Sequence, residues 1–347
     1  MLKEINEQPR AIRETIGAKL DNGSIEIEGL DLSKDYLESL NKIYIVACGT
    51  AMHAGLSGKT LIESLCEIPV EVEAASEFRY RNPIINDKTL CIFVTQSGET
   101  ADTITAVRQA KALGSHILIV TNRPDSTMAR EADSLVPVNA GIEVSVAATK
   151  SYMAQVISFY LLAIFMAEVK GVGAEVLNIL KHELIVLPQK IEEVLAHKDS
   201  IQACAKKFAN SKDFIFIARG INFATALEGA LKLKEISYIH SEAMAAGELK
   251  HGTISLMSED SCAIVMVPLE DLASKTISNI KEVKSRGSKV ILFILVSFEL
   301  VMLLTKNNNL REVIAFPKAA SAKCPMSGAP TEVTEAQLKE LGIKVSE

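Results

Sequence analysis

Residues 42–50 read KIYIVACGT and residues 89–100 read TLCIFVTQSGET, and these two stretches decide the fold class. Each is a short apolar run, rich in β-branched residues, that ends in small and polar residues. A run without apolar–polar alternation is typical of a strand buried on both faces, as in a parallel sheet. Helical patterns follow, one to about Leu65 and one over Ala101–Leu113. Strands that alternate with helices favour βαβ units and a parallel, doubly wound sheet of the α/β class.

The same pattern extends beyond these stretches and then recurs in the second half of the chain. Further strands are predicted at Val70–Ala74, whose alternation suits an edge strand, and at His116–Thr121. The second half has predicted strands at Asp213–Ala218, Cys262–Val267 and Lys289–Leu295, and predicted helices from about Phe223 to Tyr238 and at Leu272–Arg286. The two sets are offset by about 172 residues, which indicates two copies of one α/β unit.

These spacings also predict the domain organisation. A chain of 347 residues fits two domains better than one. We expect an N-terminal helical segment at 1–37, a first α/β domain at 38–175, a helical connector at 176–205 and a second α/β domain at 206–347.

Composition and charge argue against several classes of protein. The 37 Lys and Arg against 43 Asp and Glu give a formal net charge of -6, whereas nucleic-acid-binding surfaces are usually strongly basic. The longest apolar runs, Val156–Ala167 and Ile291–Leu304, fall short of the roughly 20 residues that span a bilayer, and no signal-peptide pattern opens the chain. The six cysteines lack C-x-x-C spacing, and Cys48, Cys91 and Cys262 lie in apolar runs. We therefore expect reduced core cysteines, no metal site, no cofactor, no nucleic-acid or membrane partner, and a cytoplasmic protein.

Polar residues stand where the predicted strands end, which is where ligands bind in open parallel sheets. The turn Thr95–Thr100 (TQSGET) places hydroxyls, an amide and a glycine between a strand and a helix start. Free backbone N–H groups and the positive helix end would cradle a phosphate there, with Ser97 and Thr100 adding hydroxyl bonds. The alternative is an ordinary Ser/Thr helix cap. Neither G-x-x-x-x-G-K-[ST] nor G-x-G-x-x-G occurs, which disfavours a nucleotide-binding loop.

A second polar cluster lies in the other half of the chain. Lys232 and Glu235 are three residues apart and share one face of a predicted helix. A carboxylate beside an ammonium, together with a histidine, is what proton transfer next to a carbonyl requires. The alternative for this pair is a solvated salt bridge. His251 is the better candidate histidine, and His240 is expected to be a core or capping residue.

Six segments, in this order, resemble one known family. They are KEINEQPRAI (Lys3–Ile12), CGT (Cys48–Thr50), ASEFRYR (Ala75–Arg81), QSGETADT (Gln96–Thr103), AGIEVSVAATK (Ala140–Lys150) and ALEGALKLKEISYIHSEAMAAGELKHG (Ala226–Gly252). Both halves resemble sugar-isomerase (SIS) domains, and the motif set is similar to the isomerase half of the glutamine–fructose-6-phosphate aminotransferase family. The resemblance covers about residues 1 to 290 and implies two tandem SIS domains, without the glutaminase domain of that family.

The resemblance implies an isomerising aminotransferase of amino-sugar metabolism that acts on fructose 6-phosphate and glucosamine 6-phosphate. The implied substrate-binding residues are Thr50, Thr95, Gln96, Ser97, Thr100, Val146 and Ala148. Glu235 is expected to move a proton between C1 and C2 with help from Lys232, and His251 to open the sugar ring. In the family this histidine reaches the neighbouring subunit's site, which implies a homodimer.

Departures from the family pattern bear on activity. Ala51 and Ala148 stand where the family often has serine, whereas Thr95 keeps a hydroxyl. The tail of the family carries a lysine that forms a Schiff base with the open-chain ketose. Here residues 324–347 read CPMSGAPTEVTEAQLKELGIKVSE, so Lys344 is the first candidate for that role and Lys323 the second. Glutamine-dependent activity is not expected from this chain alone.

Two other functions stay open at this point. One is a glucosamine-6-phosphate deaminase on the same scaffold, which would release ammonia instead of fixing it. The other is a non-catalytic SIS regulator that binds a sugar phosphate. A dehydrogenase is a further possibility at the level of the fold, and the missing G-x-G-x-x-G argues against it.

Overall fold

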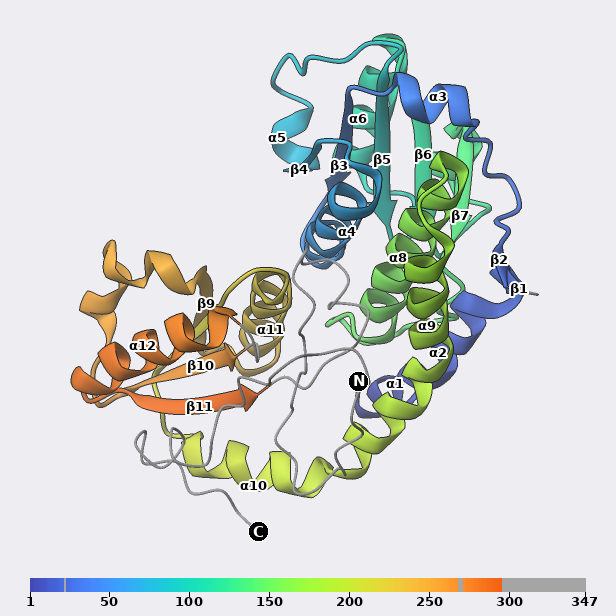
Figure 1. Cartoon of the computed structure of the whole chain (residues 1–347). Helices are drawn as coiled ribbons and strands as arrows, with labels where there is room; N and C mark the ends of the chain where they lie inside the picture. Colours follow the sequence, from blue (N-terminus) through green and yellow to red (C-terminus); the bar gives the residue numbers. More distant parts are fainter. Residues whose placement is uncertain (22, 268–270, 295–347) are drawn as a thin grey trace. The chain divides into compact units, whose positions relative to one another are not determined.

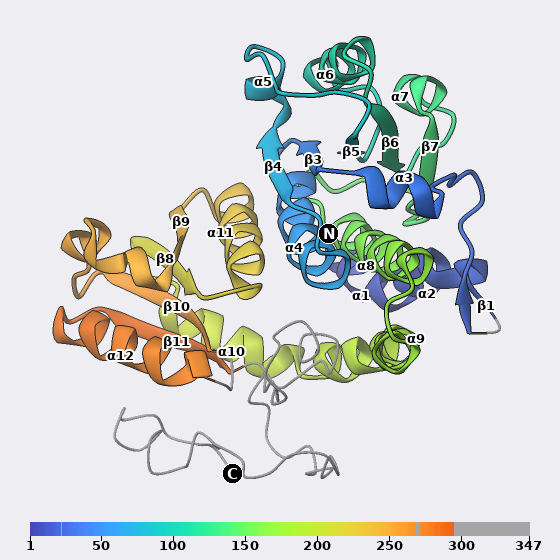
Figure 2. The same cartoon turned by 45° about the horizontal axis from the view of Figure 1, so that its top comes forward.

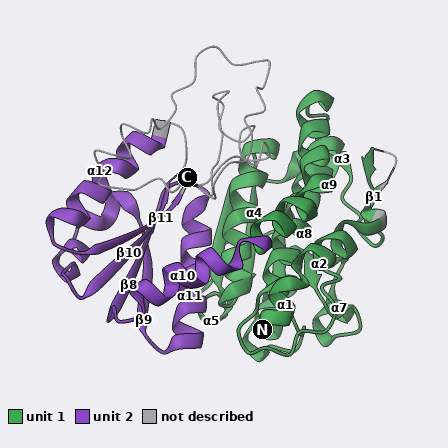
Figure 3. Ribbon diagram, turned by 90° about the horizontal axis from the view of Figure 1, so that it is seen from below, with its two compact units in different colours: residues 1–195 green, residues 196–347 purple. Residues whose placement is uncertain are grey.

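The computed structural model describes residues 1–21, 23–267 and 271–294 (Figure 1). The chain divides into two compact units, with the boundary between Leu195 and Ala196 (Figure 3). The four-part domain division drawn from the sequence stays a prediction.

The first unit is an α/β unit with a five-stranded sheet and a small hairpin. Its strands are β1 (Leu20–Asp21), β2 (Ser24–Ile25), β3 (Lys42–Ala47), β4 (Val70–Ala74), β5 (Thr89–Thr95), β6 (His116–Thr121) and β7 (Ser134–Pro137). Its helices are α1 (Leu2–Asn6), α2 (Gln8–Ile16), α3 (Lys34–Ser39), α4 (Thr50–Cys66), α5 (Ala75–Phe78), α6 (Ala101–Ala112), α7 (Thr127–Glu131), α8 (Lys150–Lys170) and α9 (Ala174–Ala196), the last of which reaches the unit boundary.

The second unit, as far as the structure describes it, repeats this arrangement with four strands. Its strands are β8 (Asp213–Ala218), β9 (His240–Ala245), β10 (Ser261–Val267) and β11 (Lys289–Ile294). Its helices are α10 (Lys198–Phe208), α11 (Asn222–Ser237) and α12 (Asp271–Ser285), with 3-10 turns at Ala246–Lys250 and Thr253–Leu256.

Both sheets are parallel and have corresponding strand orders. The order is β4-β3-β5-β6-β7 in the first unit and β9-β8-β10-β11 in the second, and every neighbouring pair in these sheets is parallel. The predicted α/β fold with two doubly wound sheets is confirmed. The sequence did not predict β7 and β9. Both are edge strands, which pair on one side only and therefore need no continuous apolar run.

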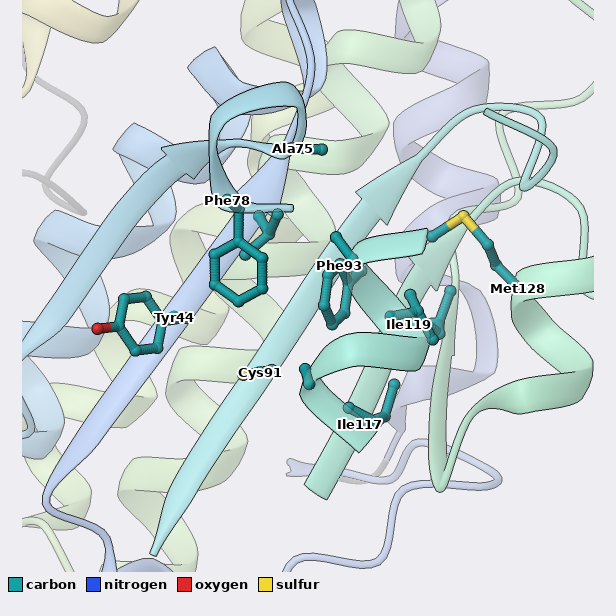
Figure 4. Close-up of a cluster of buried hydrophobic side chains, with 12 residues drawn as sticks. Tyr44, Ala75, Phe78, Cys91, Phe93, Ile117, Ile119 and Met128 are labelled. Atoms are coloured by element: carbon teal, nitrogen blue, oxygen red, sulfur yellow. The ribbon is translucent and has the colours of Figure 1, made fainter. Parts of the chain in front are cut away.

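Helices cover both faces of the first sheet, as Figure 2 shows, with α5, α6 and α7 on one face and α4 and α8 on the other. All seven residues of β5 are buried because the strand is covered on both sides. The core under α5 and α6 contains edge-to-face aromatic contacts, with ring centroids 5.7 Å apart for Tyr44 and Phe78 and 6.2 Å apart for Phe78 and Phe93 (Figure 4). Such pairs favour one packing arrangement over others.

Two glycines let α4 lie close to its neighbours. A Cβ atom at Gly55 would stand 2.6 Å from Ile45 Cγ2 of β3, and one at Gly58 would overlap the Phe159 ring of α8. Larger residues at either position would push α4 away from the sheet or from α8. This close packing fixes where α4 begins, directly after the carboxyl end of β3.

Among the described helices, only α8 is long and apolar enough to pass as a membrane span, by length and composition. Its 21 residues extend beyond the apolar run Val156–Ala167 at both ends. However, 67% of its most apolar window is buried, and the helix packs against α4 and α2. In this structure α8 is the core helix of the first unit.

Candidate functional site

A cavity of about 180 Å³ lies at the carboxyl ends of β3 and β5 in the first unit. Its lining includes six of the seven substrate-binding residues predicted from the sequence, namely Thr50, Thr95, Gln96, Ser97, Thr100 and Ala148. The seventh, Val146, is not part of the lining, and its side chain is 96% exposed. The structure therefore brings together residues that are up to about 100 positions apart in the chain.

The turn between β5 and α6 is fixed by its own hydrogen bonds. Thr95 Oγ1 accepts a bond of 3.1 Å from the Gly98 amide, and Ser97 Oγ accepts one of 3.3 Å from the Glu99 amide. Because both hydroxyls act as acceptors here, their protons stay available for a ligand. Gly98 has φ +70, and a Cβ atom at this position would overlap the Ser126 side chain, so the turn requires glycine.

Two helices, α4 and α6, begin at this cavity. The N-cap residues are Gly49 for α4 and Thr100 for α6, and neither makes a side-chain cap hydrogen bond. Thr100 is the N-cap residue of α6, but its hydroxyl makes no cap hydrogen bond to the helix. Unpaired N–H groups at a helix start carry positive partial charge and bind phosphate well. These features suit the predicted phosphate site.

Two further lining residues, which were not predicted from the sequence, come from α8. Gln155 is 2% exposed, and its Oε1 atom has no hydrogen-bond partner among the described residues. Ser151 also lines the cavity and donates its hydroxyl to the Glu143 carboxylate. A buried amide oxygen without a donor is costly, so a ligand hydroxyl would be a favourable partner for Gln155. Their four-residue spacing inside an apolar helix was the signal that could have found them.

The acid–base cluster of the second unit lies on α11. Lys232 Nζ is 2.6 Å from Glu235 Oε2 and 3.2 Å from Glu228 Oε1. The side chains of Lys232 and Glu228 are 16% and 6% exposed, whereas that of Glu235 is 31% exposed. Glu228 was missed, although its position four residues before Lys232 predicts this contact. One ammonium group therefore lies within 3.2 Å of two carboxylates on the same helix.

The two histidines of the second cluster occupy exposed positions. His251 follows the 3-10 turn Ala246–Lys250, and its amide donates to the Glu248 carbonyl at 2.9 Å. His240 is the first residue of β9, and its Nδ1 lies 3.0 Å from Asp213 Oδ1. The expectation that His240 is a core or capping residue is therefore wrong. Lys344 and Lys323 lie outside the described residues.

One cysteine expectation needs correction. Cys48 is exposed and lines the cavity, because it follows the last residue of β3 instead of lying within the strand. Cys91 and Cys262 are buried, as expected, and burial raises the pKa of each thiol to about 12. No group of His, Cys, Asp and Glu among the described residues could hold a metal ion.

Comparison with known proteins agrees with this architecture. A family model described as "SIS domain" matches residues 36–165 and 207–298. A glutamine–fructose-6-phosphate aminotransferase (isomerizing) from Clostridium tetani is 51% identical over 293 residues, which cover 84% of this chain and 48% of the relative. Its counterpart from Corynebacterium glutamicum is 41% identical over 341 residues, which cover 96% of this chain and 54% of the relative. The chain thus spans about half the length of these curated relatives.

A solved structure matches over most of both chains. The C-terminal domain of a glucosamine-fructose-6-phosphate aminotransferase from Francisella tularensis has a TM-score of 0.81 and 38% sequence identity. The match covers 84% of this chain and 83% of that domain.

Proposed function

This chain belongs to the SIS domain family and corresponds to the isomerase half of glutamine–fructose-6-phosphate aminotransferases, and from that premise we propose that it binds and isomerises a hexose 6-phosphate. The proposed substrate is fructose 6-phosphate and the proposed product class is the aldose or 2-amino aldose 6-phosphate. The wider proposal is an aminotransferase role in amino-sugar metabolism, in the cytoplasm and as a homodimer.

The observation that carries this proposal is the cavity of the first unit. Its hydroxyls on Thr50, Ser97 and Thr100 and the N-terminal ends of α4 and α6 suit a phosphate dianion. The unpaired amide oxygens of Gln96 and Gln155 supply acceptors for sugar hydroxyls. We therefore propose that the phosphate lies on the turn between β5 and α6 and that the sugar extends towards α8. Val146 stays a proposed sugar contact.

The chemistry proposed for α11 follows from its charges. The Glu235 carboxylate would remove the proton at C1 of the open-chain ketose and return it at C2. Lys232, held by Glu228 at 3.2 Å, would stabilise the enediolate oxygen with its ammonium group. We propose His251 for ring opening, with the histidine supplied across a dimer interface, and Lys344 as the Schiff-base lysine.

Incubation with fructose 6-phosphate in deuterated water tests the proposal. We expect deuterium at C1 and formation of glucose 6-phosphate, both followed by NMR, and no exchange with fructose, which lacks the phosphate. A parallel sample with glucosamine 6-phosphate and an ammonia assay measures deaminase activity. Binding without any exchange would assign a non-catalytic regulator instead, and absence of binding would overturn the proposal.

Replacement of Gln155 by Leu should weaken sugar-phosphate binding while the free protein becomes no less stable. The change removes an acceptor that a sugar hydroxyl would use, worth about 0.5–1.5 kcal/mol, or roughly 2- to 12-fold in Kd. It also removes a buried oxygen that has no described partner, so Tm should hold or rise. Calorimetry and thermal unfolding give the two numbers.

Ser158→Ala is the matched control for this prediction. Ser158 is also buried on α8, but it bonds the Ala154 carbonyl at 2.9 Å and does not line the cavity. Its loss should leave Kd unchanged. Equal Kd values for Gln155→Leu and the parent protein would remove Gln155 from the binding site.

A further inference from the structure

The loop between β7 and α8 carries Ala148 to the cavity, and in its middle stretch, residues 142–146, every apolar side chain is exposed. The side chains of Ile142, Val144 and Val146 are 86%, 83% and 96% exposed. Packing of these side chains therefore contributes little to holding the loop. The Asn122 side chain bonds the start of the loop at Ala140 and Gly141, and carboxylates hold the part that follows, beginning with Glu143, which accepts a hydrogen bond of 2.8 Å from the Thr149 amide.

The second of these carboxylates comes from α1, about 140 residues away in the chain. Glu4 Oε1 accepts hydrogen bonds from the Val144 amide at 2.6 Å and from the Ser145 amide at 3.2 Å. Glu4 is only 7% exposed, and the backbone bond from Val144 is the largest cause that lowers the pKa of its carboxyl to about 2. The carboxylate is therefore ionised whenever the loop is in this position.

The third carboxylate, Glu7, holds the other end of the loop. Lys150, the first residue of α8, has a side chain only 5% exposed, and its Nζ lies 2.6 Å from Glu7 Oε2. Removing one partner of such a pair would leave a buried charge without a counter-ion. Ser151 and Gln155, which line the cavity, lie on the first turns of the helix that Lys150 begins.

We propose that Glu4 and Glu7 are positioning residues, which clamp the loop on both sides of Ala148 and so preorganise the cavity before a ligand arrives. A ligand binds with a smaller free-energy cost when the loop is already ordered. If the loop were released from the clamp, the ligand would have to order it on binding, and the affinity would fall. The segment KEINEQPRAI (Lys3–Ile12), to which the proposed chemistry gives no role, thereby acquires one. The clamp itself rests on contacts in the structure, and only the nature of the ligand rests on the proposed function.

Two variants and a control test the clamp. Glu4→Gln and Glu7→Gln preserve side-chain size and remove the charge, and Glu14→Gln changes a glutamate of α2 that pairs at 2.9 Å with an exposed arginine. Amide hydrogen exchange at Val144 and Ser145 measures the loop directly, without any ligand. Charge-assisted bonds of this kind predict exchange faster by on the order of tenfold to a hundredfold in Glu4→Gln and no change in Glu14→Gln.

Calorimetry with fructose 6-phosphate supplies the second readout. For Glu4→Gln and Glu7→Gln we expect Kd to rise by about tenfold while the isomerisation rate at saturating substrate stays near that of the parent. Unchanged exchange at Val144 and Ser145 in Glu4→Gln would overturn the clamp, and so would a lower Tm with unchanged Kd, which indicates a purely structural role. If the parent protein binds no hexose 6-phosphate, the proposed function fails, and the exchange rates alone decide the clamp.

Discussion

Replacing Glu235 with Gln should slow exchange of the C1 hydrogen of fructose 6-phosphate by about 10²- to 10⁴-fold. Glutamine keeps the shape and can still accept a bond from Lys232, whose Nζ lies 2.6 Å from the carboxylate in the present structure. What it loses is basicity, and the enolisation step depends on that. Incubation in deuterated water followed by NMR isolates this step from every later one.

Two comparisons sharpen the result for Glu235. Glu228→Gln leaves the base in place and removes one of the two carboxylates that hold Lys232, so its rate should fall less. Glu259→Gln, an exposed change outside α11, should leave the rate unaltered. If exchange persists at the parent rate in Glu235→Gln, the base is elsewhere, and His251 is the next residue to replace.

Joint replacement of Ser97 and Thr100 by alanine is expected to weaken hexose 6-phosphate binding by about 10²- to 10⁴-fold. The two hydroxyls should donate charge-assisted bonds to the phosphate, each worth roughly 1.5–3 kcal/mol. The fold should survive, because Thr100 makes no side-chain cap bond and Ser97 loses only its 3.3 Å bond from the Glu99 amide. Titration calorimetry on the parent and the double variant gives the ratio.

Thr105→Ala is the control on the same helix. Its hydroxyl bonds the Ala101 carbonyl at 2.9 Å and lies outside the cavity, so its removal should not change Kd. An unaltered affinity in the double variant would mean that the turn between β5 and α6 does not hold the phosphate.

The fold was predictable from the sequence wherever a strand is buried on both faces. β3, β5, β8 and β10 are such strands, and their apolar runs give the boundaries within about one residue. β9 was not predicted, because an edge strand needs no such apolar run and its sequence, HSEAMA, lacks one. The predicted edge position of β4 is confirmed by the strand order, in which β4 pairs only with β3.

From the residue pattern alone, the candidate site could be predicted only where its residues lie in one continuous stretch of sequence. The turn TQSGET contains its own hydroxyls and its glycine, so one stretch was sufficient to predict it. Gln155 was missed because a polar residue in an apolar helix is usually interpreted as core. Its four-residue spacing from Ser151 indicates a shared polar face, and the packing of α8 beside the turn places that face in the cavity. The contacts of Glu4 with Val144 and Ser145 have no local pattern, because they join segments about 140 residues apart.

The fit of Gly98 against Ser126 has a consequence for anyone who redesigns this protein. Gly98 packs so closely against the Ser126 side chain that a Cβ atom would not fit. The Met128 amide donates a 3.2 Å hydrogen bond to the Gly98 carbonyl, and the Thr127 amide donates a 2.8 Å hydrogen bond to Glu99 Oε1. The conformation of the turn therefore depends on the first residues of α7, and the two segments have to be redesigned together. Loops grafted at residues 95–100 to change ligand preference must keep glycine at position 98 and these two hydrogen bonds, or bring a compatible start of α7 with them.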